Sequence, residues 1–255
     1  MRRVLVTGAN GQLGLALKHA AEDFPLNLVF MDKNALDITD TEAVKELFAN
    51  QAYDFCINAA AYTDVDGAET NKGLAYAINA KGVEALAKAC KLHQSWLIHI
   101  STDYVFDGAL DRPYTPSDMT NPLNVYGQSK LAGEQLIDAV GCIYSIVRTS
   151  WLYSHYGNNF YTKLLAQVNT GKALYVTAEQ KGCPTRADDL ASHLLKGITS
   201  QQLPTGISHY CGNEVMTWLD LARRLFNHKE VFKKSKISLG AIRPKKVELK
   251  STIKH

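Results

Sequence analysis

The chain has 255 residues, of which 46% are hydrophobic and 21% charged, and its net charge is +3. This balance indicates a packed core and fits one large α/β domain, or a domain with a small lobe. No stretch approaches the roughly 18 apolar residues of a membrane span, and the strand pattern at Arg3 leaves no room for a signal peptide. We therefore expect a cytoplasmic protein without a membrane partner. Its five scattered cysteines predict reduced thiols rather than disulfides or a zinc site.

The charge is unevenly distributed. Residues 229–255 carry nine Lys and Arg but only two Asp and Glu. Such a tail can bind a nucleotide or nucleic acid, or it can be a solvated terminus. Few aromatic residues are interleaved for base stacking, so we favour the solvated terminus and expect no nucleic-acid partner.

Apolar runs alternate with helical patterns through residues 1–150. The predicted strands are Arg3–Thr7, Leu26–Met31, Tyr53–Asn58, Trp96–Ser101 and Ile143–Arg148. The predicted helices are Leu13–Asp23, Thr41–Asn50, 67–93 and Val125–Val140. Strands that alternate with helices imply right-handed βαβ units. The predicted fold class is therefore α/β, with a doubly wound parallel sheet of the Rossmann type.

The regularity weakens beyond residue 150. Helices are predicted at Phe160–Asn169, Asp188–Thr199 and Thr217–His228, and short strands at Leu174–Thr177 and Ile207–Tyr210. We predict a dinucleotide-binding domain over residues 1–150. A small C-terminal α/β substrate lobe would occupy residues 151–255, interleaved with returns to the main domain.

A glycine-rich segment joins the first predicted strand to the first helix, with the spacing Gly-x-x-Gly-x-x-Gly. Glycines permit a tight turn and let the backbone approach a pyrophosphate at the N-terminus of a helix. This placement makes the segment a variant of the dinucleotide fingerprint. The predicted cofactor-binding residues here are Gly8, Asn10, Gly11, Gln12, Leu13 and Gly14.

Asp32 ends the second predicted strand, where an acid can accept the ribose hydroxyls of NAD. Lys33 follows and can instead hold a 2′-phosphate, so NADH and NADPH both stay open as cofactors. We place Asp37 and Ile38 near the adenine. The alternative for Asp37 is a cap of the next helix.

Tyr126 and Lys130 lie four residues apart on a predicted helix and share one face. A phenol has a reference pKa of about 10. A nearby cation favours the phenolate and is expected to lower that pKa. The pair is thus a candidate proton donor and acceptor, although the spacing also arises by chance. Thr102 ends the fourth predicted strand, where it can hydrogen-bond a substrate oxygen beside Tyr126.

The motifs together resemble the extended short-chain dehydrogenase/reductase superfamily. They are the glycine loop, Asn58-Ala59-Ala60-Ala61, Ser101-Thr102-Asp103 and the Tyr126–Lys130 pair. The small Ala59, Ala60 and Ala61 would let the cofactor lie across the sheet edge. Longer runs are similar to the dTDP-4-dehydrorhamnose reductase family. They are Leu36–Asp40, Asn58–Asp66, Ser101–Gly108, Arg148–Trp151 and Gly182–Thr185.

This resemblance implies a reaction and catalytic roles. The family reduces the C4 keto group of dTDP-4-dehydro-L-rhamnose with NAD(P)H, and the product dTDP-L-rhamnose serves surface polysaccharide synthesis. Tyr126 would protonate the C4 oxygen. Lys130 would bind the nicotinamide ribose and assist Tyr126, and Thr102 would hold the same oxygen.

The resemblance also implies substrate-binding residues. Asp103, Tyr104 and Trp151 would line the sugar pocket, Asn159 would contact the diphosphate or sugar, and Arg186 is a candidate phosphate contact. Each has an alternative: Tyr104 as a space filler, Trp151 as a core residue, Asn159 as a helix N-cap and Arg186 in a surface ion pair. His99 lies inside a strand and is interpreted as a core residue rather than a base.

The chain departs from the family pattern at two positions. Ala16 stands where the family often has a glutamate associated with Mg²⁺ at a dimer contact, and alanine cannot ligate a metal. This argues against that Mg²⁺ and that dimer, so monomer and homodimer both stay open. Val247 replaces a serine of the C-terminal signature, although Pro244 is retained. We find no His, Asp and Glu spacing typical of a catalytic metal.

Two other functions stay open on these residues. The altered C-terminal region is compatible with a non-catalytic regulatory or nucleotide-binding subunit. The other function is that of a nucleotide-sugar epimerase or dehydratase that holds NAD tightly. A dehydratase needs a further acid beside the threonine, and Asp103 would supply it.

Overall fold

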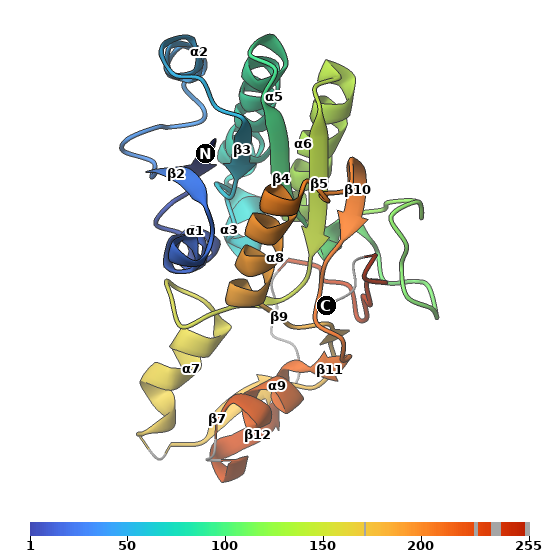
Figure 1. Ribbon diagram of the computed structural model, residues 1–255. Coiled ribbons are helices and arrows are strands. Elements are labelled where there is room, and N and C mark those ends of the chain that lie inside the picture. Colours follow the sequence, from blue (N-terminus) through green and yellow to red (C-terminus); the bar gives the residue numbers. More distant parts are fainter. Residues whose placement is uncertain (171, 227–228, 236–240, 253–255) are drawn as a thin grey trace.

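A six-stranded sheet forms the centre of the protein, seen in the computed structural model, which describes residues 1–170, 172–226, 229–235 and 241–252 (Figure 1). The strand order is β10-β5-β4-β3-β1-β2, and every pair is parallel. The strands are β1 (Arg2–Thr7), β2 (Leu26–Met31), β3 (Phe55–Asn58), β4 (Trp96–Thr102), β5 (Tyr144–Thr149) and β10 (Gly206–His209). The order reverses between β1 and β3, the position where doubly wound sheets bind ligands. The predicted fold class is confirmed.

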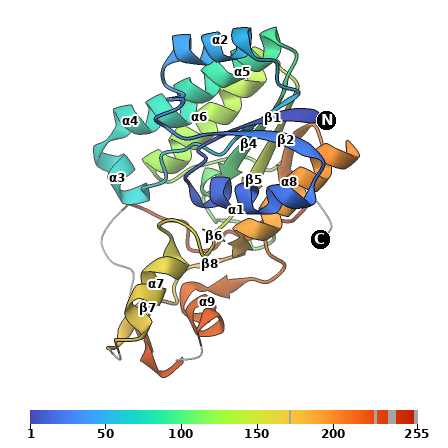
Figure 2. The same cartoon turned by 60° about the vertical axis from the view of Figure 1, so that its left-hand side comes forward.

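Helices cover both faces of this sheet (Figure 2). One face carries α1 (Gln12–Ala20) and α8 (Ala187–Ser200), and the other carries α2 (Thr41–Asn50), α5 (Val83–Leu92) and α6 (Val125–Val140). Alternate residues of β1 supply the two cores: Val4 and Val6 pack with α1 and α8, whereas Leu5 packs on the other side. Burial on both faces explains why the strands read as continuous apolar runs.

The single helix predicted over residues 67–93 is wrong. The chain forms α3 (Val65–Thr70), α4 (Lys72–Tyr76), the π-helical turn η2 (Ala77–Gly82) and then α5. Inside η2, the Asn79 side chain exchanges hydrogen bonds with the Tyr62 backbone, at 2.8 and 3.0 Å, and donates to Ser129 Oγ at 3.0 Å. The break itself falls at Asn71, whose φ of −111° and ψ of 45° are not helical, whereas the Asn79 bonds lie within the π turn. π turns of this kind often lie at functional sites.

A small lobe lies below the carboxyl ends of the strands in Figure 1. It contains α7 (Phe160–Val168), β7 (Leu174–Thr177), α9 (Trp218–Leu225) and β12 (Phe232–Ser235), packed around one apolar cluster. β12 pairs in parallel with β7 and was not predicted. The helix predicted over Thr217–His228 ends at Leu225, and its positions 227 and 228 lie outside the described residues.

Short elements connect the lobe to the sheet domain. They are β6 (Leu152–Tyr153), β8 (Lys181–Gly182), β9 (Thr185–Arg186) and β11 (Met216–Thr217). Three 3₁₀ turns lie elsewhere among the described residues: η1 (Ala21–Asp23) follows α1, η3 (Asp103–Val105) follows β4, and η4 (Lys229–Val231) precedes β12. α8 and β10 follow the first lobe elements in the chain but pack in the main domain. The domain boundary near residue 150 stays a prediction.

The basic tail is not simply a solvated terminus over its described part. Val247 and Leu249 are each 3% exposed and pack in one cluster with Val105 and Phe106. Tyr114 N–H donates to Glu248 O at 2.7 Å and Lys250 N–H donates to Tyr114 O at 2.8 Å, so the segment forms an isolated β-bridge with the main domain. The reason is a period-two pattern, in which apolar residues alternate with charged ones. It also explains Val247 in place of serine, because the side chain enters an apolar cluster.

Within the described stretches, no helix is long and apolar enough to cross a membrane. In the same stretches, no three His, Cys, Asp or Glu side chains gather as metal ligands would. Ala16 is 1% exposed and packs against α8.

Candidate active site

A cavity of about 400 Å³ lies between the carboxyl ends of the strands and the lobe. A second cavity, of about 250 Å³, lies beside it over β1 and β2. Both are lined by Asn10, Gly11, Ala59 and Ala61, so they are two parts of one groove. All of the predicted cofactor-binding residues line this groove except Gly14.

The glycine loop has the geometry that close approach of an anion requires. Gly8 has a φ of +68°, and a Cβ on it would lie 2.6 Å from the Ala60 nitrogen. A Cβ on Gly14 would collide with the Gly8 and Ala9 carbonyls, which explains its role in packing rather than in lining the groove. Gly11 is the N-cap of α1 and offers no side-chain cap. The first amides of α1 are therefore available for a phosphate.

The second cavity carries the residues that bear on the choice of cofactor. The Asp32 carboxylate accepts from Asn10 Nδ2 at 2.6 Å and from two backbone amides at 3.0 Å. Lys33 Nζ lies 3.8 Å from Asp37 in an exposed ion pair. Hydrogen bonds from Thr39 lower the pKa of Asp37. Asp37 thus closes a turn, while Asp40 caps α2.

Thr102, Tyr126 and Lys130 line the large cavity together. α6 begins at Val125 because the Asn124 side chain caps it, accepting from the Gly127 amide at 2.8 Å. The helix packs against η3. Thr102 Oγ1 donates to Asp103 Oδ1 at 3.1 Å, and Thr102 acts to lower the pKa of Tyr126, against the effect of burial. This geometry creates one site where a carbonyl oxygen can meet two hydroxyl groups.

The direction of the Tyr126 shift contradicts the simple Tyr–Lys expectation. Burial raises the pKa of Tyr126 to about 12, although its hydrogen bond with Thr102 opposes the shift. Burial also lowers the pKa of Lys130 to about 8, against the favourable charge of Glu134. Lys130 Nζ donates to Ile100 O at 2.7 Å and lies 3.2 Å from His99 Nε2. Desolvation therefore outweighs any attraction between the two side chains.

Asp103 is a second unusual acid in this cavity. It is 4% exposed, and burial raises its pKa to about 7, against its hydrogen bond with Thr102. Tyr104, its neighbour, lies edge-on to Tyr126 with ring centroids 5.8 Å apart. Both predicted pocket residues line the cavity.

A buried ion pair holds α6 against the sheet. Arg148 of β5 donates to Glu134 of α6 at 2.6 Å and 3.0 Å, and both side chains are 3% exposed. Ser101 of β4 hydrogen-bonds the same carboxylate. The helix that carries Tyr126 and Lys130 is therefore joined to β4 and β5 by charged hydrogen bonds.

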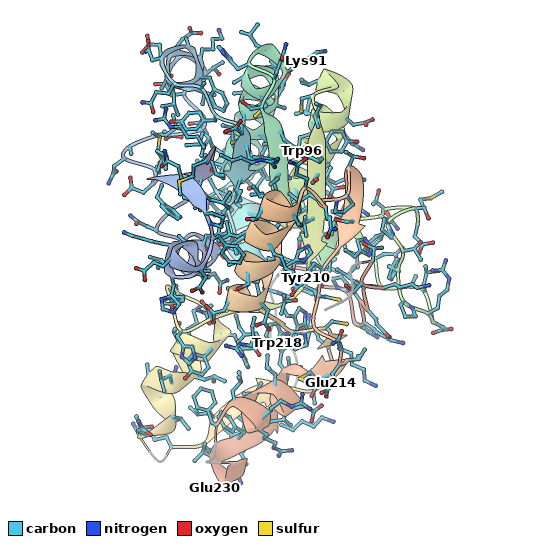
Figure 3. All side chains as sticks on the ribbon, in the orientation of Figure 1. Lys91, Trp96, Tyr210, Glu214, Trp218 and Glu230 are labelled. Carbon is cyan, nitrogen blue, oxygen red and sulfur yellow. The ribbon has the colours of Figure 1, made fainter. Side chains whose placement is uncertain are left out.

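The lobe contributes an aromatic wall. The Trp151 and Trp218 rings stack with centroids 3.7 Å apart at an angle of 4°, and both line the cavity. Trp151 has a φ of +47°, and the missing side chain of Gly182 leaves room for its ring. Figure 3 shows Trp218 at the edge of the lobe nearest the sheet domain. Sequence reasoning missed Trp218, because nothing local indicates that the start of α9 faces Trp151.

Two predicted substrate contacts lie outside this cavity. Asn159 caps α7 through a capping box, and its side-chain amide donates to Ser154 O and Tyr156 O at 3.0 and 2.7 Å. These bonds occupy the side chain, so the structure supports the helix-cap alternative. Arg186 pairs with Asp188 at 3.4 Å, which supports its surface ion-pair alternative. It lines a separate cavity of about 170 Å³.

Arg243, from the C-terminal signature, was also missed as a site residue. It donates to Asp66 at 2.8 Å and hydrogen-bonds Tyr104. With Lys163 and Trp218 it lines a third cavity of about 570 Å³, on the lobe side of the aromatic wall. Only the fold brings the 66 and 243 regions together.

Comparison with known proteins identifies the family of this chain. The family described as RmlD substrate binding domain matches residues 1–252. A dTDP-4-dehydrorhamnose reductase of Aggregatibacter actinomycetemcomitans is 40% identical over 232 residues, which cover 89% of this chain and 79% of the relative. A crystal structure of this reductase from Bacillus anthracis, in complex with NADP, has a TM-score of 0.92 and 35% identity, covering 99% of this chain and 92% of that one. The Clostridium acetobutylicum reductase gives 0.91 and 36%, covering 98% and 90%.

Proposed function

The chain belongs to the RmlD substrate binding domain family, and from this premise we propose that it is an NADPH-dependent dTDP-4-dehydrorhamnose reductase. It would reduce the C4 keto group of dTDP-4-dehydro-L-rhamnose to give dTDP-L-rhamnose. The observation that carries the proposal is that Thr102, Tyr126 and Lys130 line one cavity together with the glycine loop. NADPH, when bound, supplies the hydride.

The chain's own residues would manage the proton and the charge. Tyr126, a phenol with a raised pKa, would donate its proton to the C4 oxygen as charge develops there. Thr102 would hold the same oxygen through its hydroxyl, in the manner of an oxyanion donor. Lys130, 2% exposed at the cavity floor, would bind the nicotinamide ribose and assist Tyr126.

The glycine loop and the second cavity fit a dinucleotide. The free amides of α1 would hold the pyrophosphate, and Asp37 with Ile38 would border the adenine. Lys33 is exposed at this cavity and is paired only loosely, which favours a 2′-phosphate and hence NADPH. The NADP complex of the Bacillus anthracis relative agrees. We expect Lys33→Ala to raise the KM for NADPH more than the KM for NADH.

We also propose that the lobe built from α7, β7, α9 and β12 binds the nucleotide sugar. The sugar would lie against Trp151 and Asp103, and the diphosphate on the lobe side of Trp218. Lys163 and Arg243 supply positive charge there. The choice between monomer and homodimer stays open, and a cytoplasmic location stays a prediction. Sedimentation of the purified chain tests whether it is a monomer or a homodimer.

The proposal is tested by mixing the chain with NADPH and 4-keto sugars carried on dTDP, UDP or GDP. Oxidation of NADPH by the dTDP substrate supports it, and no turnover with any of them overturns it. An epimerase or dehydratase would convert its substrate without net NADPH consumption and would retain NAD through purification. The acidic Asp103 beside Thr102 is the observation that makes this control necessary.

A further inference from the structure

Tyr126, the proton donor of the proposed reaction, lies in the first turn of its helix. Val125 is the first residue of α6 and Tyr126 is the second. The first amides of a helix have no carbonyl partner within it, so other contacts must hold this turn. Glu69 of α3 accepts from the Val125 amide at 2.8 Å, and Asn124 accepts from the Gly127 amide at 2.8 Å. The position of Tyr126 therefore depends on groups outside α6.

Asn124 makes a second hydrogen bond, to the C-terminal region. Its Nδ2 donates to Ile242 O at 2.8 Å, and the residue is 3% exposed. The Gly127 N–H can only donate and the Ile242 carbonyl can only accept. Both ends of the amide are thus fixed, with Oδ1 toward α6 and Nδ2 toward Ile242. A serine caps a helix about as well as an asparagine, but it has no amide nitrogen for the second bond.

Asp66 of α3 fixes the segment that carries Ile242. We call this segment, Ala241–Arg243, the strap. One carboxylate oxygen of Asp66 accepts from the Ala241 N–H at 2.8 Å, and the other accepts from Arg243 Nη2 at 2.8 Å. Arg243 Nη1 also donates to Ala241 O at 3.0 Å. These bonds lie on both sides of Ile242, so they hold its carbonyl toward Asn124.

Both ends of this connection pack closely against the main domain. Pro244, directly after the strap, is buried. A Cβ on Gly108 would lie 3.0 Å from the Pro244 Cβ and 2.5 Å from Lys246 O. A Cβ on Gly127, in the first turn of α6, would collide with Tyr104 O. Close packing of this kind leaves little room for the strap and the first turn of α6 to move independently.

We propose that Asn124 is a positioning residue for Tyr126, and that it acts by joining the first turn of α6 to the strap. The hydrogen bonds form a closed ring. α3 holds the strap through Asp66, the strap holds Asn124, and α3 holds the start of α6 through Glu69. The consequence for catalysis rests on the proposed function, in which Tyr126 must reach the C4 oxygen. Misplacement by about 1 Å can lower turnover by about 10²-fold.

The first test needs no substrate. Hydrogen–deuterium exchange of the full free chain, followed by NMR, reports how often the Gly127 N–H bond opens. Asp66→Ala removes both carboxylate contacts with the strap. The Asp66 side chain is 58% exposed, so the variant should fold. The Gly127 amide should then exchange about tenfold faster, as expected for the loss of about one hydrogen bond. Unchanged exchange at Gly127 would overturn the proposal.

Two controls show whether the effect is local. The Gly141 amide donates to Ile137 O at 3.2 Å at the other end of α6, and it should exchange at the wild-type rate in Asp66→Ala. Glu214→Ala breaks another exposed ion pair, with Arg224 at 2.7 Å, and should leave Gly127 unchanged. Faster exchange along the whole of α6 would indicate a general loss of stability and would also overturn the proposal.

The second test separates positioning from capping. Asn124→Ser keeps a helix cap and loses the bond to Ile242 O. If Asn124 only caps α6, this variant should behave like the wild type. If Asn124 positions Tyr126, kcat for the dTDP-4-keto sugar should fall by about 10–10²-fold, while the KM for NADPH changes by less than about twofold. The Gly127 amide should exchange faster, as in Asp66→Ala.

Asn159→Ser is the matched control. Asn159 also caps a helix with its oxygen and donates from its amide to Ser154 O and Tyr156 O. The substitution removes the same kinds of bond from the lobe, so kcat should stay at the wild-type value. An equal fall in kcat for both variants, or wild-type kcat and exchange in Asn124→Ser, would overturn the proposal.

The exchange measurements are made without substrate. They therefore decide the proposal even where no 4-keto sugar is turned over, and failure of the reductase activity is distinguishable from failure of this connection. If Asn124→Ser does not fold, Gly127 exchange in Asp66→Ala still decides.

Discussion

The two walls of the 400 Å³ cavity, which is lined by Thr102 and Trp151, are built differently. The sheet wall carries Tyr126 beside the buried Thr102 and Lys130, whose side chains hydrogen-bond Asp103 and Ile100 of the main domain. The lobe wall carries the stacked faces of Trp151 and Trp218. Oriented donors act on charge that develops in the transition state, whereas aromatic faces bind ground and transition states alike. We therefore expect the sheet wall to determine turnover and the lobe wall to determine affinity.

The largest expected effect is on the sheet wall. Tyr126→Phe removes the proton donor and keeps the ring, so kcat should fall by about 10²–10⁴-fold. Cofactor affinity, followed by NADPH fluorescence, should be retained. Tyr104→Phe is the matched control, since its ring packs edge-on against Tyr126, and it should lose less. Normal turnover in Tyr126→Phe would refute the assignment of Tyr126 as the proton donor.

The second effect is on stability. Arg148→Met leaves Glu134 charged and unpaired at 3% exposure, which should lower the free energy of unfolding in urea by about 3–5 kcal/mol. Adding Glu134→Leu should recover much of this loss. Arg112→Ala, which breaks the surface pair with Asp118, is the matched control and should cost far less. Equal losses for the two arginines would contradict the anchoring role of the buried pair.

The third effect concerns pH. Burial raises the pKa of Asp103 to about 7, above the value of about 3.9 for an unfolded chain. The folded state therefore holds this proton more tightly. Its contribution to stability is complete below about pH 4 and is lost as the pH rises to about 7. Asp103→Asn should flatten the free energy of unfolding across this window, and an unchanged slope would count against the raised pKa.

The fourth effect tests the lobe wall. Trp218→Ala removes one face of the stack and should raise the KM for the nucleotide sugar by about tenfold, with a smaller change in kcat. Trp218→Phe, which keeps an aromatic face, should restore most of the affinity. A fall in kcat at constant KM would place Trp218 with the catalytic groups and contradict the expectation that the lobe wall determines affinity.

The smallest effect separates a cap from a substrate contact. Asn159→Ala should cost about 1 kcal/mol of stability and leave the KM unchanged, because its side chain caps α7. Asn159→Asp keeps an oxygen for the cap but turns its second oxygen toward the Ser154 and Tyr156 carbonyls, so it should not restore the lost stability. A raised KM at unchanged stability would return Asn159 to the substrate site.

Local patterns predicted the sheet domain well. The runs at β1, β2 and β4 are mainly apolar segments of strand length. The turn at Gly8 has the positive φ and the close backbone approach that a dinucleotide-binding loop requires. Patterns failed where distant residues compete. The helix predicted over 67–93 is interrupted at Asn71, and it contains a π turn at Asn79, whose side chain bonds Tyr62 and Ser129. The tail from 241 to 252 follows the main domain because its apolar positions find a cluster there.

The sequence by itself determined the fold class, the dinucleotide loop and the Tyr126–Lys130 pair, because each depends on neighbours within a few residues. Only the tertiary structure decided what surrounds that pair. Burial raises the pKa of Tyr126, and the contact of Lys130 with His99 depends on β4 lying under α6. The stack of Trp151 on Trp218 likewise joins distant segments. Desolvation and long-range hydrogen bonds are properties of the packed chain, and no spacing along the sequence encodes them locally.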